Sequence, residues 1–299
     1  MQHLVDTDQL TDAHIATILT DAQRFKHTRP PKLLRDKLLI TLFFEPSTRT
    51  RSSFEVAAKR LGASVVHLDP SRSSTKKGES LADTFANLCA MEPDGVIIRH
   101  SHNDTPRLLA EMNMTPVINA GAGHYAHPTQ ALLDLLTLEE LFAGRGGVAG
   151  KRIAIVGDIA NSRVAASGIR LLRRMGMAIT LVAPEPFMPA TDLPHTDRLE
   201  EVLDRVDVIM SLRAQLERHA KPIFDDYAEY ARHYCITESL LGDRDIRIMH
   251  PGPVMRNIDI SDAVLADPRS LVLQQVTNGV YVRMAILKLL LLDAHTQAA

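Results

Sequence analysis

Short apolar runs alternate with longer amphipathic segments along most of the chain. Short apolar runs between turn residues predict buried strands, and apolar residues recurring every three to four positions predict helices. The runs expected to form strands are 38–44, 64–68, 95–99, 116–120, 152–156, 178–182 and 206–210. Helices are expected near 48–61, 80–89, 128–142, 162–175, 199–203 and 278–293.

Strands that alternate with helices favour parallel sheets covered by helices on both faces. The densest glycine cluster, 144–150, separates two stretches with this pattern. The sequence therefore predicts an α/β protein of two doubly wound parallel-sheet domains, 1–143 and 150–299, whose last helix crosses back to pack on the first domain. In such sheets ligands bind beyond the carboxyl ends of the strands, so polar residues at those ends are the candidates for a site.

The charges nearly cancel, since 36 acidic residues face 34 Lys and Arg residues for a net charge of -2. No global field exists to attract nucleic acid or an anionic membrane. Cys89 and Cys235 lie far apart, in no ligand-like spacing. The N-terminus lacks the features of a signal peptide, and the apolar run 285–292 contains Lys288 and is too short to span a bilayer. We expect a soluble, cytoplasmic protein.

The start of the helix at 48–61 carries groups suited to a phosphate-type anion. Ser47, Thr48 and Thr50 supply hydroxyls, and Arg49 and Arg51 supply guanidinium groups. First-turn N–H groups and the helix dipole add positive potential, and Arg can bind phosphate through a bidentate fork. The alternative is an ordinary helix start, capped by Ser47 or Thr48 and flanked by solvated arginines. The Walker pattern G-x-x-x-x-G-K-[ST] is missing here.

Further polar residues follow predicted strands in both halves of the chain. They are Arg99, His127, Arg163, Arg213 and Gln215. Cations at strand ends in both halves predict an anionic ligand held between the domains. A single histidine is more often structural than catalytic, and Lys77 in a polar stretch is ordinarily a solvated lysine. Residues 157–161 lack the G-x-G-x-x-G pattern, so a nicotinamide cofactor is unsupported, and no histidine pair has the accompanying carboxylates of a metal site.

Six motifs, in order along nearly the whole chain, resemble those of the aspartate transcarbamoylase family of catalytic chains. They are Ser47-Thr48-Arg49-Thr50-Arg51, Lys76-Lys77-Gly78-Glu79, His127-Pro128-Thr129-Gln130, the segment 213–218, His250-Pro251-Gly252-Pro253 and the segment 275–280. The resemblance implies a carbamoyl-phosphate domain followed by a Rossmann-like aspartate domain. It also implies transfer of the carbamoyl group of carbamoyl phosphate to the amino group of L-aspartate in pyrimidine biosynthesis, with no metal and no cofactor.

The resemblance also implies roles for individual residues. The catalytic set is Arg49, Thr50, Lys77, Arg99, His127 and Gln130. Carbamoyl phosphate would be bound by Ser47, Thr48, Arg49, Thr50, Ser73, Lys77, Arg99, His127, Gln130 and the carbonyl of Pro251. Aspartate would be bound by Lys77, Arg163, Arg213, Gln215 and Gly252.

The family's catalytic chains form homotrimers with shared active sites, so Ser73 and Lys77 are expected to reach the site of a neighbouring subunit. Glu45 is expected to pair with Arg163 and Arg218 when the domains close. The sequence leaves open whether such a trimer binds regulatory chains or associates with dihydroorotase.

The chain departs from the family pattern at two places. Met255-Arg256-Asn257 stands where Asn-Arg-Gly is usual, and Ala165-Ala166 stands where a further arginine is frequent. Both flank the expected aspartate half of the site, so the positioning of that substrate is in question. An ornithine transcarbamoylase, the nearest alternative, is expected to carry His-Cys-Leu-Pro in place of the motif at 250–253. A non-catalytic assembly subunit is expected to have lost part of the anion-binding set.

Overall fold

The computed structural model describes residues 1–68, 79–218 and 223–293. The chain forms two compact units: unit 1 comprises Met1–Leu136 and Thr277–Ala299, and unit 2 comprises Thr137–Val276. The boundaries between them fall inside two helices, α5 (Pro128–Leu141) and α10 (Val272–Lys288). The C-terminal part of α10 thus belongs to the unit that begins at the N-terminus. The domain limits 1–143 and 150–299 remain a prediction.

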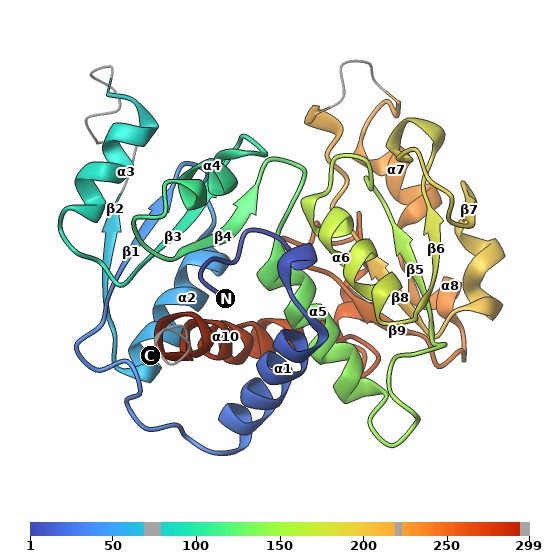
Figure 1. Cartoon of the computed structure of the whole chain (residues 1–299). Helices are drawn as coiled ribbons and strands as arrows, with labels where there is room; N and C mark the ends of the chain where they lie inside the picture. The colour runs from blue at the N-terminus through green and yellow to red at the C-terminus, as the bar shows by residue number, and fades with distance from the viewer. Residues whose placement is uncertain (69–78, 219–222, 294–299) are drawn as a thin grey trace. The chain divides into compact units, whose positions relative to one another are not determined.

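Unit 1 contains a four-stranded parallel sheet in the order β2-β1-β3-β4 (Figure 1). Its strands are β1 (Leu38–Phe43), β2 (Ser64–Leu68), β3 (Gly95–His100) and β4 (Val117–Ala122). Its remaining helices are α1 (Asp12–His27), α2 (Thr48–Leu61), α3 (Leu81–Cys89) and α4 (Thr105–Glu111). Because every pair is parallel, all four carboxyl ends lie at one edge of the sheet.

Helices cover both faces of the unit 1 sheet. One face packs against α3 and α4 in a core that includes Ile40, Phe85, Val96 and Leu109. Figure 1 shows α2, α10 and α1 on the other side. A π-helical turn, Leu289–Asp293, follows α10. Both faces of the sheet are therefore shielded from water. This explains why the sequences of β1 and β3 are continuous apolar runs rather than alternating apolar and polar residues.

Unit 2 contains a five-stranded parallel sheet in the order β7-β6-β5-β8-β9. Its strands are β5 (Arg152–Val156), β6 (Ala178–Val182), β7 (His195–Thr196), β8 (Val208–Ser211) and β9 (Arg247–Met249). Its helices are α6 (Arg163–Arg174), α7 (Tyr227–Tyr234), α8 (Glu238–Leu241) and α9 (Asp262–Ala266). The predicted fold class, two parallel-sheet α/β domains with a C-terminal helix, is confirmed.

Several predicted elements agree with the structure residue for residue, and others do not. The helix predicted at 48–61 is α2, and it ends at Gly62 because that residue takes a left-handed φ of 95°. The segment predicted as a helix near 199–203 is a 3-10 helix, Leu199–Arg205. The last helix begins at Val272, six residues earlier than predicted from position 278.

One helical stretch is long and apolar enough to cross a membrane. Among the described residues it is Val272–Leu292, 21 residues with a mean hydropathy of 1.2. Within its most apolar window 67% is buried inside the protein, as in a core helix.

Candidate active site

The polar candidates of unit 1 follow three neighbouring strands of one sheet. β1 lies between β2 and β3, and β3 lies beside β4. The segment after β1 leads into α2, Arg99 is the penultimate residue of β3, and the chain after β4 leads to His127 at the start of α5. Parallel strands bring these three points to the same edge, as the sequence predicts.

The start of α2 is a helix N-terminus without a side-chain cap. Ser47 is the N-cap residue, one of the two candidates that the sequence offers, but within the described residues its hydroxyl makes no capping hydrogen bond. By contrast, Thr11, Ser80 and Ser162 each accept a backbone N–H at the start of their helices. The first-turn N–H groups of α2 are therefore open to an anion.

Arg49 and Thr50 project from the first turn of α2 with different surroundings. Thr50 is buried, whereas Arg49 is exposed as a whole residue. Partial desolvation of its guanidinium nevertheless lowers the pKa of Arg49 below its ordinary value. A guanidinium group keeps its positive charge in proteins, so Arg49 supplies a permanent cation.

Arg99 is held at the edge of the sheet by two contacts within unit 1. Its Nη1 donates to the carbonyl oxygen of Ala120 on β4 at 3.3 Å. Its Nε lies 3.4 Å from a carboxylate oxygen of Glu45, in the segment between β1 and α2. The position of Arg99 is therefore fixed in two ways: by the pairing of β3 with β1 and by the contact with Glu45 just after β1. The side chain of Arg218, one expected partner of Glu45, lies outside the described residues, so that pairing remains a prediction.

His127 and Gln130 lie at the start of α5. His127 is almost fully buried, and its carbonyl accepts the backbone N–H of Gln130 at 3.0 Å. The Gln130 side-chain amide donates to Asp134 one turn later at 3.0 Å. This bond fixes the orientation of the Gln130 amide.

A buried arginine from the C-terminal helix joins the two helices that carry these residues. Arg283 donates to Ser53 on α2 at 3.0 Å and to Thr129 on α5 at 3.2 Å. Its guanidinium also lies 5.0 Å from the ring centre of Phe54. Burial lowers the pKa of Arg283 to about 10, so the group is still protonated at neutral pH. A fixed, buried cation thus joins α2 to α5, the two helices that carry the candidate residues.

The glycine of the motif at 275–280 has a packing reason. A Cβ at Gly279 would lie 2.7 Å from Nη1 of Arg283 and 3.1 Å from Leu133 on α5. The neighbouring Asn278 accepts a hydrogen bond from Lys26 on α1 at 2.9 Å. This motif therefore packs α10 against the helices of unit 1.

Two predicted residues, Ser73 and Lys77, lie outside the described residues. Glu79, the next described residue after them, accepts a hydrogen bond from Thr84 on α3 at 2.8 Å.

Unit 2 repeats the arrangement with its own three neighbouring strands. β5 lies between β6 and β8, and β8 lies beside β9. Arg163 opens α6 after β5, Arg213 and Gln215 follow β8, and His250, Pro251 and Gly252 follow β9. Four of the residues predicted to bind aspartate therefore also lie at the carboxyl edge of a parallel sheet: Arg163, Arg213, Gln215 and Gly252.

The segment after β5 is tied to the segment after β8. Gly157 has a φ of +120°, and a Cβ there would lie 2.7 Å from the carbonyl oxygen of Leu212, so this close approach requires glycine. Fully buried Asp158 accepts the side-chain amide of Asn161 at 3.2 Å. Gln215 in turn donates to the carbonyl of Asn161 at 3.3 Å.

Arg213 is partly exposed and engaged with a neighbouring carboxylate. Its Nη2 lies 2.7 Å from Glu217, and its side chain is 34% exposed. Tyr227 also donates to Glu217, at 2.9 Å. A surface pair of this kind contributes little stability, so a ligand carboxylate can replace Glu217 at low cost.

The departure from the family pattern after Pro253 has a local explanation. Asn257 takes a left-handed φ of 61°, a conformation for which Asn is the best-suited residue after Gly. Its side chain accepts the backbone N–H of Asp262 at 2.9 Å. Asparagine can thus stand where glycine is usual without changing the course of the loop.

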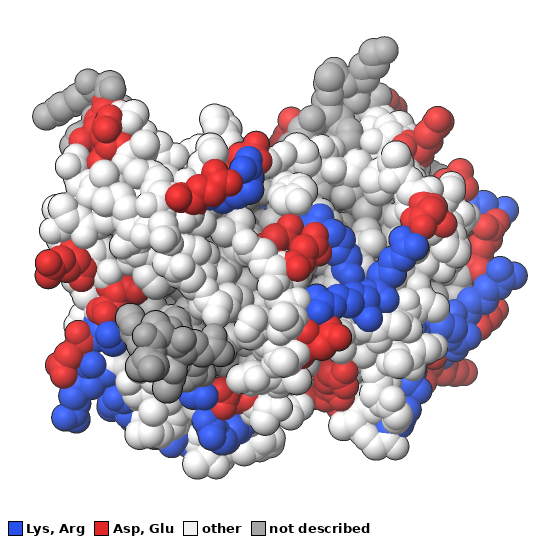
Figure 2. Space-filling view, in the orientation of Figure 1, with Lys and Arg blue, Asp and Glu red and all other residues white. Residues whose placement is uncertain are grey.

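Basic side chains gather over α6 in Figure 2. The helix carries Arg163, Arg170, Arg173 and Arg174. Arg173 forms a solvent-exposed pair with Asp192 at 2.8 Å. Arg163 differs from Arg173 and Arg174 because it lies at the N-terminal start of the helix, beside the strand ends.

Three supporting residues were not singled out by the sequence analysis: Asp134, Arg283 and Asp259. Each is a charged residue that the structure buries. Asp134 and Arg283 are lone charges within apolar helical runs, which is the signal that could have identified them. Among the described residues, no group of three or more His, Cys, Asp or Glu side chains could hold a metal ion.

Family models match both halves of the chain. One, described as aspartate/ornithine carbamoyltransferase, carbamoyl-P binding domain, matches residues 2–140. A second, described as aspartate/ornithine carbamoyltransferase, Asp/Orn binding domain, matches residues 149–290.

Similar proteins cover nearly the whole chain. The aspartate carbamoyltransferase catalytic subunit of Sulfurovum sp. (strain NBC37-1) is 76% identical over 295 residues, covering 99% of this chain and 100% of the relative. That of Sulfurimonas denitrificans is 56% identical, covering 98% and 100%.

Solved structures agree. The catalytic subunit of M. jannaschii aspartate transcarbamoylase is 34% identical with a TM-score of 0.88, covering 99% of each chain. The Trypanosoma cruzi enzyme in complex with carbamoyl phosphate and aspartate is 33% identical with a TM-score of 0.85, covering 96% of this chain and 95% of that chain. The predicted resemblance is confirmed, and the chain belongs to the aspartate/ornithine carbamoyltransferase family.

Proposed function

We propose that this chain transfers the carbamoyl group of carbamoyl phosphate to the amino group of L-aspartate, giving N-carbamoyl-L-aspartate and phosphate. The observation that carries the proposal is the uncapped start of α2, with Arg49, Thr50 and Arg99 at one sheet edge. Relatives named aspartate carbamoyltransferase support the choice of reaction. A place in pyrimidine biosynthesis and a cytoplasmic location belong to the same proposal.

The first half of the proposal assigns carbamoyl phosphate to residues of unit 1 and to the carbonyl of Pro251. The phosphate is bound by Ser47, Thr48, Arg49 and Thr50, with Arg99 touching both ends of the substrate. His127, with Thr50, binds the carbamoyl oxygen, and Gln130 accepts from the carbamoyl nitrogen, as does the Pro251 carbonyl. The donors suited to the oxygen that gains negative charge in the transition state are Arg49, Thr50, Arg99 and His127. One lost donor of this kind typically costs roughly 100- to 1,000-fold in rate.

The reaction needs no nucleophile from the protein. The aspartate amine attacks the carbamoyl carbon, the bond from that carbon to the phosphate oxygen breaks, and the departing phosphate takes the amine proton. The protein supplies orientation, which can account for several kcal/mol of the barrier. Lys77 contributes charge to the same centre.

The second half of the proposal assigns the aspartate carboxylates to Arg163, Arg213 and Gln215, with Gly252 beside them. Two guanidinium groups suit a dicarboxylate through charge-assisted hydrogen bonds. They would repel the side-chain ammonium of ornithine. Arg213 pairs with the carboxylate of Glu217 in the structure, and a substrate carboxylate would take the place of that group.

The test is a carbamoyl-transfer assay in which the purified chain receives aspartate and ornithine side by side. We expect turnover with aspartate as the acceptor and none with ornithine. Turnover with ornithine alone would replace the substrate assignment, and turnover with neither would favour a non-catalytic assembly subunit.

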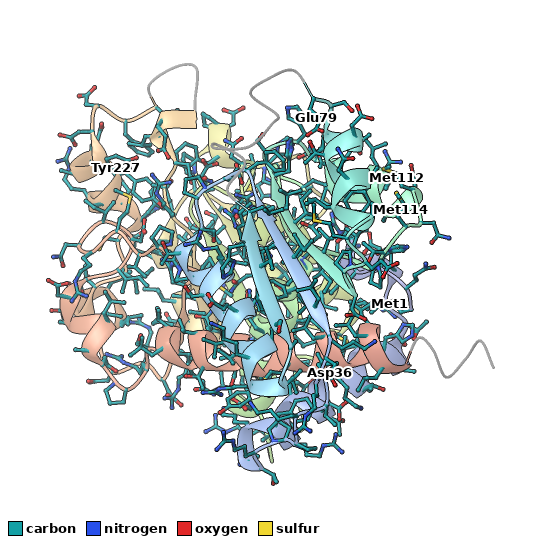
Figure 3. All side chains as sticks on the ribbon, turned by 90° about the vertical axis from the view of Figure 1, so that its left-hand side faces the viewer. Met1, Asp36, Glu79, Met112, Met114 and Tyr227 are labelled. Carbon is teal, nitrogen blue, oxygen red and sulfur yellow. The ribbon has the colours of Figure 1, made fainter. Side chains whose placement is uncertain are left out.

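A homotrimer with shared sites is the second part of the proposal, because Ser73 and Lys77 are assigned to the site of a neighbouring subunit. Strand β2 is an edge strand of unit 1, and Val66 on it is 44% exposed, with Val56 on α2 at 40%. Exposed apolar groups beside an unpaired strand edge favour association. Figure 3 looks onto this side of unit 1.

Subunit mixing tests the shared site. Arg49→Ala and Lys77→Ala chains are each expected to be inactive alone, and mixing them after dissociation should restore part of the turnover. Mixtures that stay inactive, although the chains exchange, would show that each site is complete within one chain.

A further inference from the structure

Asp259 is a fully buried carboxylate that accepts hydrogen bonds from three separate parts of unit 2. Its Oδ2 accepts the backbone N–H of Met255 at 2.8 Å. Its Oδ1 accepts the backbone N–H of Ala214 at 3.3 Å. The same Oδ2 lies 3.1 Å from Nε2 of His250, which is also buried. A carboxylate is suited to this place because it accepts at both oxygens and donates at neither.

The surrounding bonds determine the tautomer of His250. Its Nδ1 accepts the backbone N–H of Gly252 at 2.8 Å, so the ring proton is on Nε2 and is donated to Asp259. The backbone N–H of His250 donates to the side chain of Gln275 at 2.9 Å. His250 therefore connects the carboxylate of Asp259 to the backbone N–H of Gly252, the residue after Pro251.

The contact with Ala214 connects the same carboxylate to the other segment of the site. Ala214 is fully buried and lies between Arg213 and Gln215. The main-chain carbonyl of Asp259 also accepts the backbone N–H of Ile236 at 3.1 Å and the hydroxyl of Ser211 at 3.5 Å. Asp259 is thus anchored through its own backbone as well as through its side chain.

We propose that Asp259 is a positioning residue for the aspartate substrate: its carboxylate holds the Arg213–Gln215 segment and the Pro251–Gly252 loop in one arrangement. The inference rests on the proposed function of these two segments. The carboxylate accepts directly from Ala214 in the first segment, and it meets the loop through His250 and Met255 on either side of it. A displacement of either segment therefore costs a buried hydrogen bond. The separation between the carboxylate-binding groups is therefore set before substrate arrives.

The test is Asp259→Asn, which preserves size but replaces one acceptor oxygen by a donor. An amide oxygen facing His250 and Met255 leaves the amide N–H₂ facing the Ala214 N–H, so the segment with Arg213 must shift. A misplacement on the order of 1 Å can cost about 100-fold, so we expect the KM for aspartate to rise roughly 10- to 100-fold. The inhibition constant of inorganic phosphate, a probe of the unit 1 residues, should change less than about twofold.

Two further variants separate positioning from general destabilisation. Asp207→Asn makes the same chemical change in unit 2, at a carboxylate that accepts the backbone N–H of Arg152 at 2.9 Å and touches neither loop. It should leave the KM for aspartate unchanged. Asp259→Glu retains both acceptor oxygens and should recover part of the aspartate affinity.

The outcomes distinguish this inference from the proposed function. A folded Asp259→Asn variant with unchanged KM for aspartate, or with equal losses for aspartate and phosphate, would overturn the positioning role. If that variant does not fold, His250→Gln decides by the same two readouts, since it breaks the contact from the other side. A wild-type chain that transfers no carbamoyl group to aspartate would instead reject the proposed function.

Discussion

The two units place their polar groups in the same way but support them with opposite charges. Each unit uses the carboxyl ends of three neighbouring parallel strands: β1, β3 and β4 in unit 1, and β5, β8 and β9 in unit 2. Beneath the edge of unit 1 lies a buried cation, Arg283. The corresponding segments of unit 2 are held by buried carboxylates, Asp158 and Asp259.

The difference follows from the kind of group that each support must hold. In unit 1 the buried guanidinium donates to hydroxyls on α2 and α5, which can accept these hydrogen bonds. In unit 2 the carboxylates accept N–H groups of loops that have no regular structure to satisfy them. In both units the sheet topology determines where the candidate residues lie, and buried charges hold the segments that carry them in place.

The largest effect is expected from Arg49→Ala in unit 1. Arg49 is assigned to the phosphate and lies near the developing charge, so its loss should reduce kcat by roughly 1,000-fold while the fold remains intact. Steady-state kinetics at saturating aspartate and carbamoyl phosphate provide the measurement. Arg107→Ala is the matched control, because Arg107 is an exposed arginine of the same unit paired with Asp104 and Glu111. Near-normal kcat in Arg49→Ala would reject the assignment.

The next effect concerns the buried support of unit 1. Arg283→Met removes the donors to Ser53 and Thr129 and leaves the Gly279 carbonyl without its 3.1 Å bond to Arg283. Leaving such groups buried and unsatisfied should lower the free energy of unfolding by about 2–4 kcal/mol. Urea unfolding followed by circular dichroism measures the loss.

Arg24→Met is the control for this comparison. Arg24 pairs with Asp21 at 2.8 Å on the same unit, but its side chain is 58% exposed, so the loss should stay below about 1 kcal/mol. Equal losses in the two variants would mean that the buried cation gives unit 1 no special support.

A smaller and different effect is expected from Arg213→Ala in unit 2. Arg213 is assigned to a substrate carboxylate, so the KM for aspartate should rise about 10- to 100-fold, the effect expected for a lost charge-assisted hydrogen bond. The inhibition constant of inorganic phosphate should stay unchanged. A loss of phosphate affinity as large as the loss of aspartate affinity would contradict the assignment of phosphate to unit 1 and of aspartate to unit 2.

Much of the fold could be predicted from local pattern. The elements at 48–61, 64–68, 152–156 and 178–182 agree with α2, β2, β5 and β6 at both ends. Each has a clear apolar period and a turn residue at its boundary. Other elements begin at a different residue than predicted. β8 begins at Val208 rather than at 206, because Val206 and Asp207 lie before the stretch that pairs with β5.

The sequence by itself determined the strand–helix alternation, the helix start with its hydroxyls and guanidinium groups, and the candidate cations, because these depend on residues that are neighbours along the chain. Only the tertiary structure showed what holds them. Arg283 meets Ser53 across 230 positions and Thr129 across 154, and Asp259 meets Ala214 across 45. No local pattern encodes such contacts, because they arise only when the strands and helices pack. The motif can be read from the chain, whereas the buried charges that support it are found only in the folded protein.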